Sequence, residues 1–231
     1  LVDDVIVGCA MPEAEQGNLP CLQSACRDQG VPLVGGIFPA LIDGGGFTAG
    51  RVWLLRFNRM PPRFLLADIN GAAEGAVRQL VAATADRLGD ETAGAAPPLL
   101  FLVFDGMLPN IATLLAGVYG EIRGRVSYAG VNAGSETFQP LPCLFDSERV
   151  VGGGVLGLLL PGATRVAVRH DYPVAETLLR ATSTVGNCII KIDGRPAFEV
   201  YREVIAAEYQ VAVTHENFYD HAVHFPFGVV L

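Results

Sequence analysis

Short apolar runs alternate with amphipathic stretches along this chain, and the alternation predicts strands and helices in turn. Residues 5–8 and 99–104 are apolar or glycine at every position, which is typical of strands buried on both faces. Helical spacing instead marks residues 77–88 and 111–122, where apolar side chains recur every three or four positions. We therefore expect a layered fold of the α/β (α+β) class.

The order of elements repeats. Gly30 and Gly36 recur 94 positions later as Gly124 and Gly130. This repetition predicts two related β-α-β-β-β halves, and the short links between their later strands predict antiparallel hairpins, so that mixed sheets are flanked by helices. Chance similarity of two βαβ pieces is the alternative. The expected strands and helices lie at 5–8, 19–29, 52–57 and 64–69 in the first half, and at 99–104, 111–122, 155–160 and 165–168 in the second.

A third segment follows the two halves. It contains a strand at 188–192, a turn at Asp193-Gly194 and a helix that begins near Pro196 and runs to about Tyr209. The stretch 89–98 (GDETAGAAPP) resembles a linker. We therefore divide the chain at 1–93, 94–180 and 181–231.

Composition narrows the functional classes. Of 231 residues, 51% are hydrophobic and 17% charged, so there is enough apolar surface to exclude disorder. The net charge is −8, and no cluster of Lys and Arg is present, which argues against nucleic-acid binding. The uncharged stretches fall short of the roughly 18 apolar residues that a membrane span needs.

The ends and the cysteines bear on location. The chain begins LVDDVIVG, without a signal peptide, and stops in the apolar run FPFGVVL, so we expect a fragment of a longer protein. Five irregularly spaced cysteines without a CxxC pair predict mostly reduced, buried thiols and a cytoplasmic location.

Glycine-rich segments are the first candidate binding elements. Gly35 and Gly36, and likewise Gly130 and Asn132, are expected in loops that follow apolar strands. Backbone amides in such loops can approach a ligand closely, and ligands tend to bind at strand ends in α/β folds. Tight turns packed under a helix are the alternative. Their equivalent places in the repeat favour one pocket between the two halves.

Polar residues after the second buried strand are further candidates. Asp105 and Asn110 flank the start of the helix at 111–122, where they could hold an amine or a carboxylate. Alternatively, Asn110 caps the helix and Asp105 caps the turn after the strand.

His170 and Cys143 could meet a metal. His170 follows an expected strand, where a neutral imidazole could bind a haem iron, and Cys143 could supply a thiolate. No GxSxG, HExxH, Walker or GxGxxG motif is present, so we expect no enzyme.

Several segments together resemble FIST domain proteins, a sensory family of intracellular signal transduction. They are GVPLVGGIFP, FDGMLPNIATLL, SYAGVNAG, PCLF, VGNCIIKIDGRPAFEVYREVI and HFPFG. The likeness is greatest to bacterial nitric-oxide-sensing haem proteins (the NosP group), in which a histidine followed by Gly-Trp occupies the position of His170. Here Asp171 and Tyr172 follow that histidine.

This resemblance implies a cytoplasmic ligand sensor. Haem would be the ligand, His170 its axial ligand, and a histidine kinase or a cyclic-di-GMP enzyme the partner that the sensor regulates. It also implies that residues 181–231 begin a truncated C-terminal FIST region. A protein-interaction scaffold, and an amino-acid-type sensor without haem, are the alternatives, and self-association is left open.

Overall fold

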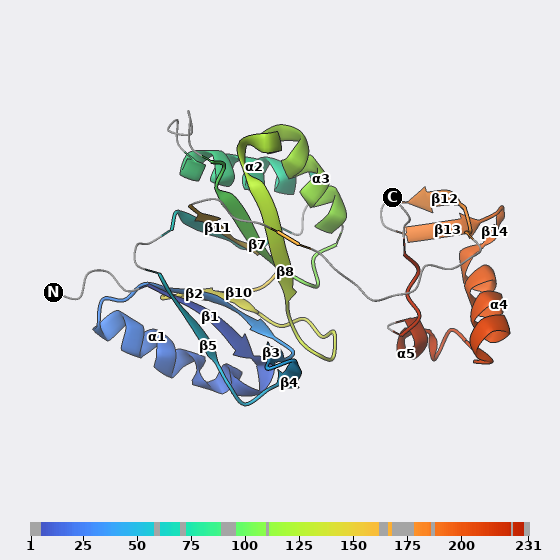
Figure 1. Ribbon diagram of the computed structural model, residues 1–231, viewed down its shortest axis with the longest axis horizontal. Helices are drawn as coiled ribbons and strands as arrows, with labels where there is room; N and C mark the ends of the chain where they lie inside the picture. Colours follow the sequence, from blue (N-terminus) through green and yellow to red (C-terminus); the bar gives the residue numbers. More distant parts are fainter. Residues whose placement is uncertain are drawn as a thin grey trace. The chain divides into compact units, whose positions relative to one another are not determined.

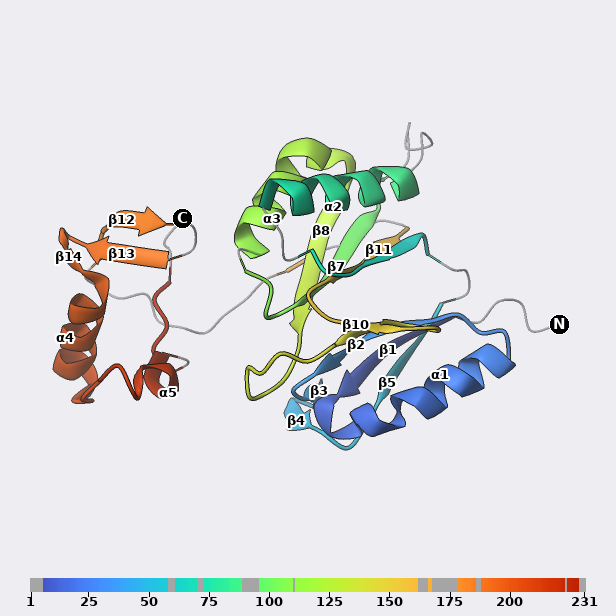
Figure 2. The ribbon, with the colours of Figure 1, turned by 180° about the vertical axis from the view of Figure 1, so that it is seen from behind.

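A computed structural model shows two compact units, residues 1–169 and 170–231, each with its own core. Figures 1 and 2 show the elements of each unit from opposite sides. The structure describes residues 6–57, 61–69, 73–88, 96–109, 111–161, 166–167, 178–185, 188–222 and 224–228.

Two mixed sheets build the first unit. Sheet A has the strand order β10-β9-β2-β1-β5, and sheet C has the order β6-β11-β7-β8. In each, the first strand of one half (β1 or β7) lies between a parallel strand (β2 or β8) and an antiparallel one (β5 or β11). The strands are β1 (Ile6–Pro12), β2 (Leu33–Phe38), β5 (Trp53–Phe57), β6 (Arg63–Leu66), β7 (Leu99–Asp105), β8 (Ser127–Ala133), β9 (Leu144–Asp146), β10 (Val150–Val151) and β11 (Val155–Leu160).

Helices cover the outer faces of the two stacked sheets, giving four layers (Figure 1). Helix α1 (Leu19–Asp28), preceded by the short helix η1 (Glu13–Asn18), packs on sheet A. Helices α2 (Ala73–Leu88) and α3 (Ile111–Ile122) pack on sheet C, and η2 (Arg123–Arg125) follows α3. The α/β class with mixed sheets and flanking helices is therefore confirmed.

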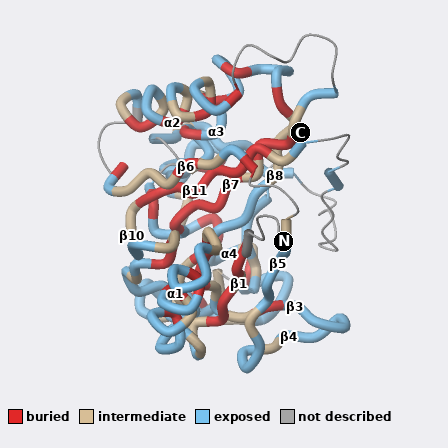
Figure 3. Tube along the Cα trace, turned by 90° about the vertical axis from the view of Figure 1, so that its left-hand side faces the viewer, coloured by how far each residue is buried: buried red, intermediate tan, exposed pale blue. Residues whose placement is uncertain are grey.

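This layering explains the unbroken apolar strands. Along β7, Leu100, Leu102 and Phe104 face the core under α2 and α3. Val103 points to the opposite face of β7 and belongs to the second core, which contains residues of both sheet C and sheet A. Figure 3 shows buried residues along β7 and β11 accordingly. Since successive side chains of a strand point to opposite faces, a strand covered on both sides needs apolar residues throughout.

The two halves exchange strands. Strand β6, from the first half, pairs with β11 in sheet C, and β9, from the second half, pairs with β2 in sheet A. The expected strands 52–57 and 64–69 therefore form no hairpin, which corrects that prediction. Strand β5 pairs with β1 in sheet A, whereas β6 pairs with β11 in sheet C. The boundaries 1–93, 94–180 and 181–231 stay a prediction.

Each exchanged strand places a phenylalanine over a glycine of the opposite half. Phe145 of β9 pairs with Gly35, and Phe64 of β6 pairs with Gly157. A Cβ atom on Gly35 would lie 2.5 Å from the Phe145 ring, and one on Gly157 would lie within 2.2 Å of the Phe64 ring. The missing side chains thus make room for the rings, an aromatic–glycine pairing that fixes strand register.

The glycines expected in loops lie inside strands, which is a correction. Gly35 and Gly36 belong to β2, and Gly130 and Asn132 belong to β8. The physical reason is close strand approach, because a Cβ on Gly35 or Gly130 would lie 2.1 or 2.3 Å from a carbonyl oxygen of the neighbouring strand. By this geometry Gly130 corresponds to Gly35, one residue away from the 94-position alignment.

The second unit combines a small sheet with two helices. Strands β12 (Ala181–Val185), β13 (Cys188–Ile192) and β14 (Arg195–Pro196) form an antiparallel sheet. The predicted turn at Asp193-Gly194 is confirmed, with φ values of 48° and 79°. Helix α4 (Ala197–Tyr209) buries Tyr201 and Ile205, with Phe198 partly buried, and α5 (Phe218–Ala222) packs beside it.

Other predicted elements agree or fall outside the described residues. Helices at 19–29, 77–88 and 111–122 and strands at 155–160 and 188–192 match observed elements. The hairpin of β3 (Leu41–Asp43) and β4 (Gly46–Thr48) was not predicted. Residues 166 and 167 of the strand expected at 165–168 are described and form no strand, whereas residues 165 and 168 and most of the linker at 89–98 lie outside the described residues.

None of the helices that the structure describes is both long and apolar enough to cross a membrane.

The exchange predicts a sharp difference between two Gly→Ala variants. Gly35→Ala should lower the free energy of unfolding by about 2 kcal/mol or more, because its Cβ would overlap both a backbone oxygen and the Phe145 ring. Gly120→Ala, in α3 with open space at that position, should instead raise it by up to about 1 kcal/mol. Urea unfolding followed by circular dichroism measures both, and equal stability of the two variants would contradict the packing described.

Candidate functional site

The carboxyl ends of the parallel strand pairs meet at a seam between the two sheets. The amide of Gly134, after β8, donates to the Ile37 carbonyl in β2 at 2.8 Å. The Ile37 amide donates to the Cys143 carbonyl at 2.7 Å, and the Gly106 amide donates to the Ala133 carbonyl at 2.8 Å. The first of these bonds joins the two sheets, and the other two lie within sheet A and sheet C, so the backbone groups at the strand ends bond one another.

Asp105 is buried at this seam, with 3% of its surface exposed. Its Oδ1 accepts the Met107 amide at 2.9 Å, and its Oδ2 accepts the Gly153 amide at 2.6 Å. The carboxylate thus holds both the turn after β7 and the loop before β11. These bonds match the alternative interpretation, in which Asp105 caps the turn after its strand.

Cys143 is fully buried beside Asp105. Burial, the negative charge of Asp105 and the hydrogen bond that the thiol donates to it together raise the pKa of the Cys143 thiol to about 12. Cys9 is similar, since burial and then the nearby Cys26 raise its pKa to about 12. Cys143 keeps its proton at neutral pH and serves as a core residue.

The structure brings together part of the predicted site. Asp105 contacts Cys143, a Cβ on Gly36 would lie 3.4 Å from Ala133, and Asn132 is exposed near Gly106. Gly35 and Gly130 instead lie inside their strands. Asn110 and His170 lie outside the described residues.

A groove lies away from this seam, where the exchanged strands β6 and β9 approach each other. Its volume is about 720 Å³. The wall formed by residues 61–66 includes β6, a second wall comes from α2, and the turn after β9 supplies a third. We call it the arginine groove; its other lining residues are Val34, Ala83, Asp86, Arg87, Asp146, Arg149 and Leu156.

Two arginines of the groove cover the outer edge of β6, the last described strand of sheet C on that side. Arg87 Nε donates to the Arg63 carbonyl, and Arg149 Nη2 donates to the Leu65 carbonyl, both at 2.9 Å. Side chains that donate hydrogen bonds to the free carbonyls of an edge strand block the pairing of that strand with another chain. The same bonds hold both guanidinium groups at the groove.

The turn that carries Arg149 is itself held firmly. Asp146 Oδ1 accepts the amides of Glu148 and Arg149 at 2.9 and 3.0 Å. Gln23 of α1 donates to the Asp146 carbonyl at 2.8 Å, and Ser147 Oγ accepts the Leu33 amide at 2.8 Å. This wall of the groove is therefore anchored to α1 and β2.

Sequence reasoning missed these arginines because nothing marks them as a group. Arg63, Arg87 and Arg149 come from two halves and match no motif. The one local signal is that Arg63 stands between two prolines and an apolar strand, a position where a charged side chain would end half-buried.

Cys143 does not fit the role of a thiolate ligand to a haem iron. The Cys143 thiol is buried and protonated, and metal binding requires the thiolate. Among the described residues there is no group of three or more His, Cys, Asp and Glu that could hold a metal ion. The haem prediction therefore depends on His170.

The buried thiols predict a loss of stability in alkali. A folded-state pKa raised from about 9 to about 12 contributes stability that is complete below pH 9 and is lost as pH rises toward 12. At about pH 10.5, Cys143 alone should lower the free energy of unfolding by about 2 kcal/mol relative to neutral pH. Cys143→Ala should flatten this decline in urea unfolding. The exposed Cys21 is the control, and Cys21→Ala should keep the wild-type profile; identical profiles for all three proteins would refute the assignment.

A comparison with protein families found a match over most of the chain. The family model for the FIST N domain matches residues 3–195, which include all of the strands and helices described for the first unit. Searches of curated proteins and of solved structures found no match to the chain. Because the family match covers more than half of the sequence, the chain belongs to the FIST family, whose domains are sensory, ligand-binding domains of signalling proteins.

Proposed function

We propose that this chain senses a small molecule in the arginine groove and passes the signal to a partner protein without catalysing a reaction. The observation that carries the proposal is the groove itself. Its volume of about 720 Å³ lies within the range of about 300–1,000 Å³ that is typical of small-molecule sites. Its walls come from both halves, so a bound ligand would contact elements of both sheets.

The groove also offers a physical route for a signal. Arg149 links it to the turn at 146–149, and that turn is bonded to Gln23 and Arg27 of α1. A ligand that draws Arg149 away from the Leu65 carbonyl would change the environment of α1. We propose a histidine kinase or a cyclic-di-GMP enzyme as the partner, on the basis of the family resemblance.

Haem with nitric oxide is the most specific ligand proposal from the resemblance, with His170 as the axial ligand. We expect a haem titration of the full-length protein to give a saturable Soret band that shifts with nitric oxide. His170→Ala should remove the band, whereas His215→Ala, whose imidazole stacks on the Phe198 ring, should keep it. A flat titration would end the haem proposal and leave the groove proposal standing.

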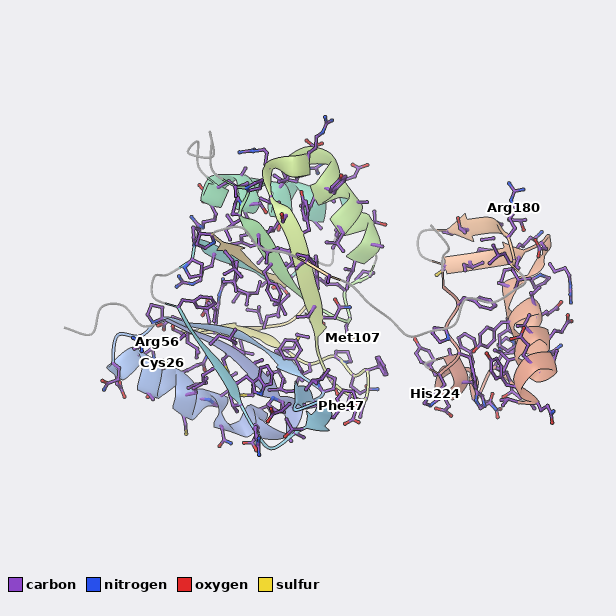
Figure 4. All side chains as sticks on the ribbon, viewed as in Figure 1. Cys26, Phe47, Arg56, Met107, Arg180 and His224 are labelled. Atoms are coloured by element: carbon purple, nitrogen blue, oxygen red, sulfur yellow. The ribbon has the colours of Figure 1, made fainter. Side chains whose placement is uncertain are left out.

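One surface favours the alternative of a protein-interaction scaffold. Strand β5, the last described strand of sheet A on its side, exposes Trp53, Leu54 and Leu55 to the extent of 43–57%. Phe47 on the nearby β3–β4 hairpin is 84% exposed (Figure 4). Exposed apolar side chains on an uncovered strand edge are typical of surfaces that pair with another chain. If this surface were the whole function, changes in the arginine groove would leave partner binding unaltered.

Filling the groove tests the sensor proposal. Ala83 lines it and Ala82, the preceding residue of α2, is exposed. A thermal-shift screen of metabolites should find ligands that raise the Tm of the wild-type protein, because binding to the folded state stabilises it. Ala83→Trp should abolish these shifts, and Ala82→Trp should preserve them.

Two controls keep this test decisive. Circular dichroism and the Tm without ligand establish that Ala83→Trp is folded, and the smaller Ala83→Leu, which should weaken the shifts, serves if it is not. Ligand-induced shifts of wild-type size in a folded Ala83→Trp protein would show that the ligand binds elsewhere.

A further inference from the structure

The charges of the arginine groove are unevenly matched. Three arginines and two aspartates line it, in a protein whose net charge is −8. Arg87 pairs with Asp86 at 2.7 Å, and Arg149 pairs with Asp146 at 3.4 Å. Each aspartate thus has its own arginine, and Arg63 is the remaining cation.

Arg63 has no side-chain hydrogen bond to any described residue, although it is half-buried. Its backbone carbonyl accepts Arg87 Nε, so Arg63 of β6 and Arg87 of α2 lie beside each other where two walls of the groove meet. Burial lowers the pKa of the Arg63 guanidinium most, the charge of Asp146 raises it, and the charge of Arg87 lowers it by a smaller amount. Burial therefore disfavours the positive charge of Arg63, and an anion bound beside the guanidinium would stabilise that charge.

Several N–H donors of the three groove arginines have no hydrogen-bond partner among the described residues. A guanidinium carries five N–H donors in a planar fork that fits a carboxylate or a phosphate. Arg87 uses Nε and Nη1, and Arg149 uses Nε and Nη2, in the bonds that fix their positions. Nη2 of Arg87, Nη1 of Arg149 and the whole fork of Arg63 make no hydrogen bond within the described part of the chain.

We propose that the arginine groove binds a small oxyanion, a carboxylate or phosphate group of the sensed molecule, with Arg63 as its principal anchor and Arg87 and Arg149 as flanking donors. This inference rests on the proposed function and gives its ligand a chemical class. Arg63 would form the charge-assisted, two-pronged bond that such groups favour. The apolar residues Val34, Ala83 and Leu156 would contact the remainder of the ligand.

Thermal unfolding in different anions tests the proposal. At constant ionic strength, sodium phosphate or sodium succinate should raise the Tm of the wild-type protein saturably relative to sodium chloride. Arg63→Gln should reduce the apparent affinity about tenfold or more. Arg63→Lys should bind more weakly than wild type, since an ammonium lacks the fork. Comparing phosphate with succinate identifies which oxyanion the groove accepts.

The control is Arg56→Gln, an exposed arginine of β5 that does not line the groove (Figure 4). It should keep the wild-type response. This comparison removes the general stabilisation that phosphate gives to many proteins through exclusion from their surfaces, because that effect does not depend on Arg63.

A second readout separates ligand binding from a structural role. In chloride alone, Arg63→Gln should leave the Tm unchanged or raise it, because it removes an unmatched, half-buried charge. A fall of several degrees in chloride would mean that Arg63 stabilises the fold, and would overturn the proposal. An identical phosphate response in wild type and Arg63→Gln would overturn it as well.

The outcomes also separate this inference from the proposed function. If uncharged metabolites raise the Tm, Ala83→Trp abolishes that effect, and oxyanions have none, the groove is a ligand site and the oxyanion inference is wrong. If wild-type ligand responses persist in folded Ala83→Trp and Arg63→Gln, both are wrong.

Discussion

Packing of a phenylalanine from each exchanged strand over a glycine of the opposite half is the constraint on which the first unit depends. The packing of Phe145 on Gly35 stabilises β9 in sheet A, and the packing of Phe64 on Gly157 stabilises β6 in sheet C. A buried phenylalanine contributes on the order of 3 kcal/mol or more to stability. Since each half lends a strand to the other, neither sheet is complete without both, and we expect the unit to unfold cooperatively.

The exchange also creates the groove. Strand β6 and the turn after β9 would not meet if each half kept its own strands, and the groove lies between them. Arginines cover the exposed carbonyls of β6, which protects this edge and leaves guanidinium donors facing the groove. One set of side chains thus serves the fold and the site together. A ligand there would contact both halves at the place where they depend on each other.

The seam at the carboxyl ends of the strands has a different character. There the polar groups bond one another, as Asp105 does with the amides of Met107 and Gly153, so little bonding capacity is left for a ligand. In the arginine groove, by contrast, two arginines are matched and Arg63 is not. Satisfied polar groups favour a structural role, and an unmatched half-buried cation favours binding.

Much of the fold was predictable because local periodicity sets it. The strand at 155–160 and the helix at 111–122 agree with the structure residue for residue. Which sheet a strand joins depends on long-range packing, so the destinations of β6 and β9 could not be predicted. Gly35 and Gly130 show why their position could not be predicted, since glycine is common both in loops and in crowded strands. The nearby carbonyl oxygen that excludes a side chain at each position is known only from the fold. Arg63, Arg87 and Arg149 meet only after the exchange, so no spacing in the sequence announces them.

The most direct test of the central claim is amide hydrogen exchange of the protein with and without phosphate. If the arginine groove is the ligand site, protection should rise in β6, in the turn at 146–149 and in the last turns of α2, and should follow phosphate concentration to saturation. Protection that rises instead after β7 and β8, around Gly106 and Gly134, would place the ligand at the seam and contradict the account.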